Sequence, residues 1–231
     1  MKDQKLDVTY FNSYNEGYYP YLENDLKKIL APILATLSKT DSLQLLEIGC
    51  ASGQFTQHIN AYLNNKNCHY YGVDIAKAPL EYFPFYGIVC DAHLLAFRPK
   101  SFDLISYPAA LHHLEPINSA LNAANDVLKD TGFLYFLEPN LFHPHRCFFM
   151  KINWLYKMIK RIDEIPINPY TLKNDLVKRG FSIITFEFIN LDFKAPSLLQ
   201  KIQNYISRTK LAKRFPFFFN PWFIILARKN V

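Results

Sequence analysis

Acidic side chains stand where short apolar runs of the sequence end. Glu47, Asp74 and Asp91 each occupy such a position, within or directly after a run that reads as a buried strand. A carboxylate at a strand end can accept hydrogen bonds from the two hydroxyl groups of a ribose, or it can cap the helix that follows. For a single acid the cap is the simpler interpretation. Three acids at successive strand ends favour a nucleoside-binding edge.

A loop with two glycines, Gly49-Cys50-Ala51-Ser52-Gly53, follows the first of these runs. Glycines between a strand and a helix let the backbone pass close to a ligand at the positive end of the helix dipole. The loop lacks the Gly-Lys-Ser/Thr ending of a phosphate-binding Walker loop. It also has Ala51 and Gln54 where a dinucleotide fingerprint carries glycines. The loop therefore indicates another adenosine-type ligand, with a plain tight turn as the alternative.

Two adjacent histidines, His112 and His113, follow the apolar run at residues 102–107. Imidazole titrates near neutral pH, so either side chain could take a proton from a hydroxyl group. The alternative is that one histidine is packed and the other caps the next helix. Another pair, in His143-Pro144-His145, has a proline between the histidines and lacks further ligands, so no metal site is expected.

Apolar runs alternate with helical periods along the chain, as in a parallel sheet covered by helices on both faces. Strands are expected at residues 43–48, 69–73, 87–90, 102–107, 133–137, 181–189 and 222–227, the last two as an antiparallel pair. Helices are expected at residues 24–37 (with Pro32 as a kink), 56–63, 118–128 and 170–179, and a turn at 129–132. Ligands bind at the carboxyl edge of such a sheet, where these acids and the segment Glu138-Pro139-Asn140 are expected to gather.

The composition fits one globular domain, since half of the 231 residues are apolar and 20% are charged. No secretory signal or membrane span is expected, and the four scattered cysteines suggest neither a zinc knuckle nor a disulfide framework. A cytoplasmic location is therefore expected. Net charge is +6, and residues 195–214 hold five cations without an acid. This segment predicts a lid helix with a basic side or a membrane-surface helix, and not a uniformly basic surface for nucleic acid.

Five segments in order resemble the motifs of the class I S-adenosylmethionine-dependent methyltransferases. They are Leu45–Gly53, Tyr71–Ile75, Cys90–Phe97 with Ser101–Ile105, Leu111–Leu114 and Val127–Leu134. The likeness covers residues 10–140 and is closest to the ubiquinone-pathway-like, methyltransferase type 11 subgroup. It implies an α/β fold: a Rossmann-like, seven-stranded, mostly parallel sheet with helices on both faces, an antiparallel edge strand and a helical cap.

The resemblance implies one methyltransferase domain over residues 1–231. In it, residues 1–40 form an N-terminal helical cover, residues 41–142 the cofactor-binding half, and residues 143–231 the substrate-cap helices and last two strands.

The resemblance also implies S-adenosyl-L-methionine as cofactor and a role for each matching position. Glu47 organises the loop, and the backbone of Gly49, Cys50, Ala51 and Gly53 faces the methionine moiety. Asp74 holds the ribose hydroxyls with Ile75 against the adenine, whose edge meets Asp91 and Ala92. Tyr107 or Pro108 lies beside the sulfonium, and Tyr14, with Tyr10 and Phe11, falls where relatives cover the cofactor. The family usually has glycine at the position of Ala51.

The function implied is methyl transfer to a small-molecule or lipid-like acceptor, mainly by positioning, with His112 or His113 as a candidate general base. The alternatives are an RNA or protein methyltransferase and a catalytically silent partner subunit of the same fold. The amino-group modifier signature Asn-Pro-Pro-Tyr is absent, and intact Glu47, Asp74 and Asp91 oppose a silent subunit. No nucleic-acid partner is expected, and residues 195–219 are a candidate for peripheral membrane contact.

Overall fold

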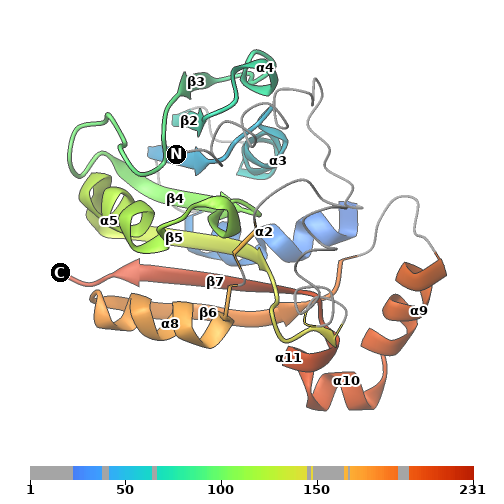
Figure 1. Ribbon diagram of the computed structural model, residues 1–231. Helices are drawn as coiled ribbons and strands as arrows, with labels where there is room; N and C mark the ends of the chain where they lie inside the picture. The colour runs from blue at the N-terminus through green and yellow to red at the C-terminus, as the bar shows by residue number, and fades with distance from the viewer. Residues whose placement is uncertain are drawn as a thin grey trace.

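The computed structural model describes residues 23–37, 42–63, 67–144, 147, 164–165, 167–191 and 198–231. Its strands form one seven-stranded sheet in the order β3-β2-β1-β4-β5-β7-β6 (Figure 1). The strands are β1 (Leu43–Ile48), β2 (Cys68–Asp74), β3 (Tyr86–Val89), β4 (Phe102–Pro108), β5 (Leu128–Pro139), β6 (Phe181–Ile189) and β7 (Trp222–Lys229). β1 to β5 pair in parallel, and β7 is antiparallel to both of its neighbours. The expected mostly parallel sheet with an antiparallel pair at one edge is confirmed.

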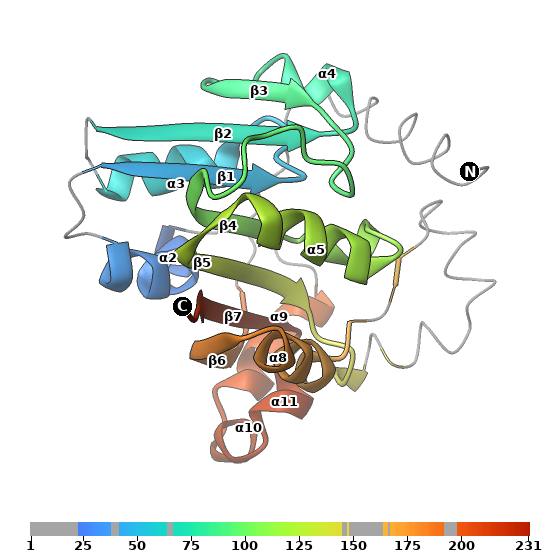
Figure 2. The same ribbon diagram turned by 90° about the vertical axis from the view of Figure 1, so that its left-hand side faces the viewer.

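Helices cover both faces of this sheet (Figures 1 and 2). One face packs on α2 (Glu23–Leu37) and α3 (Gln54–Leu63), and the other on α5 (Ile117–Val127) and α8 (Pro169–Lys178). Successive side chains of a strand point to opposite faces of the sheet. In β5, Tyr135 therefore packs in the core under α2 and α3, and Phe136 in the core under α5 and α8. Strands covered on both sides therefore read as continuous apolar runs, which is how the sequence revealed them.

The helix predicted at residues 24–37 is α2, and it contains Pro32 as expected. α8 ends just before Gly180, whose φ of +86° is the left-handed conformation that suits glycine after a helix. Between β2 and β3 lies the short helix α4 (Lys77–Leu80).

The prediction of a turn at residues 129–132 is wrong, because these residues belong to β5. Leu128 follows α5 directly and already belongs to β5, and the β4–β5 pairing shifts register between Phe102 and Leu104. The turn-forming residues are thus absorbed as an irregularity within one strand. Lys129 there pairs with Asp103 at 2.7 Å.

Three further helices lie beside β6 and β7, at the end of the molecule where β5 ends (Figure 1). They are α9 (Leu198–Ser207), α10 (Lys210–Arg214) and α11 (Pro216–Phe219). Asn140, directly after β5, holds the last of them, α11, by donating from Nδ2 to the carbonyl oxygens of Phe217 and Asn220, at 2.6 and 2.7 Å. Most of residues 143–161, at the start of the predicted cap of residues 143–231, lies outside the described residues. Among those described, none of the helices has the length and apolar character needed to cross a bilayer.

Candidate active site

The loop after β1 is a compact backbone turn against the end of β2. The N–H groups of Gly49 and Cys50 both donate to the carbonyl oxygen of Val73, at 2.8 and 3.1 Å, and the N–H of Gly53 donates to Cys50 at 2.7 Å. φ is +68° at Gly49, +45° at Ala51 and +74° at Gly53. Ala51 therefore adopts the left-handed conformation for which glycine is better suited, at the position where the sequence departs from the family.

Gly49 also brings this loop against the turn that follows β4. A β-carbon at Gly49 would lie 2.7 Å from the β-carbon of Ala110, closer than two such atoms approach. Ala110 precedes the single-turn helix η1 (Leu111–His113), which carries both histidines. Glycine at this position thus holds the predicted cofactor loop beside the predicted catalytic residues.

Asp74 ties the loop to the end of β2. Its Oδ2 accepts a hydrogen bond from the N–H of Ala51 and its Oδ1 one from the N–H of Ala76, both at 2.8 Å. Burial raises the pKa of this carboxyl above its ordinary value. Each carboxylate oxygen has a second lone pair, so these bonds leave capacity for ribose hydroxyls. The next residue, Ile75, is 38% exposed and offers an apolar surface at the strand end.

Asp91 is held by its neighbour His93. The backbone N–H of His93 lies 2.9 Å, and its Nδ1 2.7 Å, from Oδ1 of Asp91. Burial raises the pKa of Asp91, but the bonds with His93 outweigh it and hold this pKa below its ordinary value. Ala92 is buried and packs in the core that includes α5. The predicted contacts of both residues with the adenine edge stay predictions.

Glu47 is buried beneath the loop, at the start of α3. Its Oε2 accepts from the backbone N–H of Thr56 at 3.0 Å and from the Thr56 hydroxyl. Burial raises its pKa to about 8. Glu47 thus joins β1 to the first turn of α3. The Cys50 side chain is buried as well, and a β-carbon at Gly72 would lie 2.6 Å from its sulfur. The Cys50 side chain therefore packs against β2 and is buried away from solvent.

One predicted cofactor contact, the Tyr107 side chain, is not brought to this edge. The Tyr107 side chain is fully buried, stacks on Phe136 at 5.1 Å between ring centroids, and donates from its hydroxyl to Ala120 at 3.4 Å. The expectation that this side chain lies beside the sulfonium is therefore wrong, because it belongs to the core under α5. Tyr14, Tyr10 and Phe11 lie outside the described residues.

Glu138, at the end of β5, organises the histidine turn. It is fully buried, and its Oε1 accepts from the backbone N–H groups of Ala110 and Leu111, at 3.0 and 2.7 Å. Its Oε2 lies 2.6 Å from Nδ1 of His112, which is 5% exposed. A neutral imidazole that donates from Nδ1 has Nε2 as its acceptor nitrogen. His112 is therefore arranged to accept a proton or a metal ion at Nε2.

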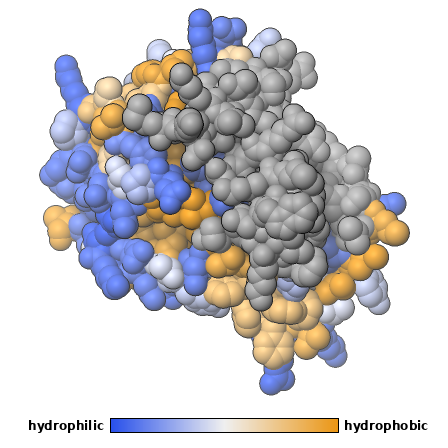
Figure 3. All heavy atoms as spheres, viewed as in Figure 1, coloured by the Kyte–Doolittle hydropathy of each residue, from blue (hydrophilic) through white to orange (hydrophobic). Residues whose placement is uncertain are grey.

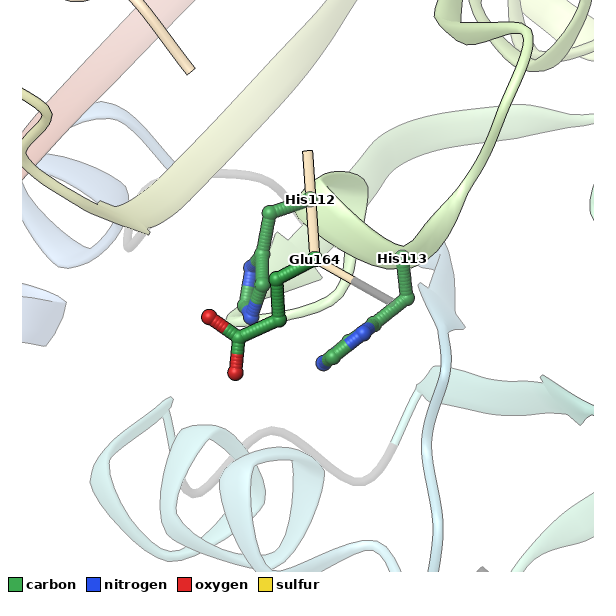
Figure 4. A group of neighbouring side chains, drawn as sticks. All are labelled: His112, His113 and Glu164. Atoms are coloured by element: carbon green, nitrogen blue, oxygen red, sulfur yellow. The ribbon is translucent and has the colours of Figure 1, made fainter. Parts of the chain in front are cut away.

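A second carboxylate completes this group. One potential ligand atom from each of His112, His113 and Glu164 lies within 4.8 Å of the others, and the three side chains point to the same side of the turn (Figure 4). The two rings have centroids 4.0 Å apart. The N–H of Ile165 donates to the carbonyl oxygen of His112 at 2.8 Å, which fixes Glu164 beside the turn. Neither histidine caps α5, whose N-cap is Pro116.

Known proteins resemble this chain in sequence and in fold. Residues 46–134 match the model of a methyltransferase domain family. The structure resembles a crystal structure of an S-adenosylmethionine-dependent methyltransferase from Archaeoglobus fulgidus, with a TM-score of 0.63, 20% identity, and coverage of 89% of this chain and 94% of the other. The domain family thus matches residues 46–134, and the fold is the Rossmann-like fold of S-adenosylmethionine-dependent methyltransferases. S-adenosylmethionine is the cofactor that this family and fold imply, and the loop, Asp74 and the exposed Ile75 fit it.

Two curated relatives are longer than this chain. An uncharacterized protein of Methanocaldococcus jannaschii is 28% identical over 175 residues, covering 75% of this chain and 62% of the relative. A mitochondrial protein of Rattus norvegicus named arginine-hydroxylase NDUFAF5 is 24% identical over 198 residues, covering 80% of this chain and 55% of the relative. The chain thus spans little more than half the length of these proteins.

Proposed function

We propose that this protein transfers a methyl group from S-adenosylmethionine to a small-molecule or lipid-like acceptor. The observation that carries the proposal is the Glu138–His112 pair, on a turn that packs directly against the cofactor loop through Gly49 and Ala110. The cofactor supplies an electrophilic methyl group when it is bound. The protein then has to hold the acceptor in line with that group and exclude water.

His112 is the residue we assign to proton removal. Glu138 fixes the tautomer in which Nδ1 donates and Nε2 accepts, which is the arrangement of a general base. Because Glu138 is itself held by two backbone N–H groups, the ring is fixed in one orientation. Loss of such a base lowers the turnover of a hydroxyl acceptor by about 10²–10⁴-fold.

Transfer of radiolabelled methyl from S-adenosylmethionine, measured separately in lipid, small-molecule, protein and RNA fractions, tests this proposal. We expect label in the lipid or small-molecule fraction, and we expect His112→Asn to reduce the rate while cofactor affinity stays unchanged. The exposed His69→Asn is the matched control. Label in RNA or protein would support the alternative methyltransferase classes, and no label in any fraction would support a silent subunit.

A lipid-like acceptor is favoured by the surface of the helices α9 to α11. Apolar side chains are exposed there beside basic ones (Figure 3), among them Leu198, Ile202, Tyr205, Leu211, Phe215, Phe217 and Phe218. Lys201, Arg208, Lys210, Lys213 and Arg214 are also exposed, and no acid lies in this stretch. Exposed apolar groups with surrounding cations suit the surface of an anionic membrane. We therefore propose peripheral membrane contact through residues 195–219.

Hydroxylation of an arginine side chain is a second candidate. It is favoured by the relative named as an arginine-hydroxylase and by the group of His112, His113 and Glu164. Such a reaction inserts one oxygen atom from O₂ and needs two electrons and two protons to convert the other oxygen to water. Mass spectrometry of the product separates the two candidates, since methyl transfer adds one CH₂ unit and hydroxylation adds one oxygen atom.

A further inference from the structure

We propose that His112, His113 and Glu164 form a binding site for one divalent transition-metal ion. Two imidazoles and one carboxylate are ligands that zinc, iron(II) and cobalt(II) accept, and three protein ligands leave coordination positions open for an exchangeable molecule. The metal ion would sit at the carboxyl edge of the sheet, next to the turn that contacts the cofactor loop. The inference goes beyond the proposed function and holds whichever reaction the protein performs.

The spacing of the three groups is close to what a metal ion needs. Their potential ligand atoms lie within 4.8 Å of one another. Ligand bonds of about 2.0–2.1 Å place two ligand atoms of a tetrahedral site roughly 3.4 Å apart. The side chains therefore have to close by about 1–1.5 Å, which small side-chain rotations accomplish. His113 and Glu164 are partly exposed, so an ion can reach them from solvent.

The surroundings of His112 are those of a metal ligand. Metal-bound histidines commonly donate their other ring N–H to a carboxylate, which fixes the ring and increases its basicity. Glu138 provides this contact at 2.6 Å, and it is anchored in turn by the N–H groups of Ala110 and Leu111. The carboxylate of Glu164 arrives from a separate segment, which is held by the 2.8 Å bond between Ile165 and His112. Independent parts of the chain thus converge on one point.

A bound ion would change the part that His112 plays. Nε2 has one lone pair, which binds either a proton or the metal ion, so metal binding weakens as the histidines become protonated. With the ion in place, an acceptor hydroxyl or a water molecule in an open coordination position loses its proton more readily through the ion's charge. His112 then acts as a ligand, and Glu138 remains its positioning residue.

Metal binding can be measured without cofactor or acceptor, so failure of this inference is distinguishable from failure of the proposed function. The protein is stripped with a chelator, dialysed, and titrated with Co²⁺ and Zn²⁺ at near-neutral pH. We expect one equivalent to bind, with visible Co²⁺ absorption of a nitrogen and oxygen site and without the near-ultraviolet band of thiolate ligands.

Two variants test the ligands separately. Glu164→Gln and His113→Gln are each expected to weaken Co²⁺ binding at least tenfold, with an unchanged far-ultraviolet circular dichroism spectrum. The exposed Glu115→Gln and His69→Gln are the matched controls, and they should bind as the wild type does. Three results would overturn the proposal: no stoichiometric binding, a thiolate spectrum from the cysteines, or affinity unchanged in both ligand variants.

Discussion

Replacing Gly49 with alanine tests the contact that joins the cofactor loop to the histidine turn. Two effects add at this position. An alanine with φ near +68° is disfavoured by about 1–2 kcal/mol. Its β-carbon would also lie 2.7 Å from that of Ala110, and overpacking of this kind costs about 1–3 kcal/mol. A gain of about 0.4–1 kcal/mol comes from the more restricted unfolded chain. We therefore expect Gly49→Ala to lower the free energy of unfolding by roughly 2–4 kcal/mol.

Gly180 provides the matched control for the backbone effect. Its φ is +86°, but a β-carbon there would meet no atom within 4 Å. Gly180→Ala should therefore show only the conformational effect of about 1 kcal/mol. The difference between the two variants, measured by urea denaturation, isolates the contact with Ala110.

A double-mutant cycle with Ala110→Gly completes the test. Removing the Ala110 β-carbon makes room for the new methyl group, so Gly49→Ala should be about 1–3 kcal/mol less destabilising in that background. Gly49→Ala as mild as Gly180→Ala, together with a zero coupling energy, would refute the packing of the loop against the histidine turn.

Three further predictions concern the loop, the buried acid and the cap. Ala51→Gly should remove left-handed strain at φ +45° and raise the free energy of unfolding by up to about 1 kcal/mol; a clear loss in urea denaturation would contradict this. Burial raises the pKa of Glu47 from an ordinary 4.5 to about 8, so the folded state binds the proton more tightly and stability falls as pH rises between these values. Glu47→Gln should abolish that fall, on the order of several kcal/mol, in denaturation curves across this pH range; a persisting fall would show that another group is responsible. Sedimentation with vesicles should show binding to anionic but not zwitterionic lipid, weakened by salt and by Lys210→Glu with Lys213→Glu; equal binding to both lipids would contradict an electrostatic contact.

Much of the fold follows from apolar periodicity in the sequence. The bounds predicted for β1 and β6 are those observed, because both segments have an uninterrupted pattern between clear turn residues. The prediction of a turn at residues 129–132 was wrong because a turn-type sequence can equally form an irregularity inside a strand. Of the acids predicted at the strand ends, Asp74 does contact the loop after β1, since parallel strands deliver their carboxyl ends to one edge.

The parts of the site that sequence could not reveal depend on side-chain direction and on distant contacts. Tyr107 lies in a strand buried on both faces, where apolar residues point both ways and no polar alternation tells them apart. Glu164 joins His112 and His113 only through the folded chain, so no local spacing connects it with them. For the other histidine pair, His143 and His145, the sequence predicts no metal site, because a proline separates them and further ligands are lacking. The backbone bond from Ile165 to the carbonyl oxygen of His112, which brings Glu164 near, leaves no pattern in the sequence.

Calorimetric titration with S-adenosylhomocysteine is the most direct test of the central claim that this loop and Asp74 hold S-adenosylmethionine. We predict saturable binding of one molecule per chain. Asp74→Ala should weaken it by about 1.5–3 kcal/mol, as for the loss of charge-assisted hydrogen bonds to the ribose. No detectable binding at millimolar ligand would contradict the cofactor assignment. An affinity unchanged by Asp74→Ala would show that Asp74 does not bind the cofactor and serves only to hold the backbone through Ala51 and Ala76.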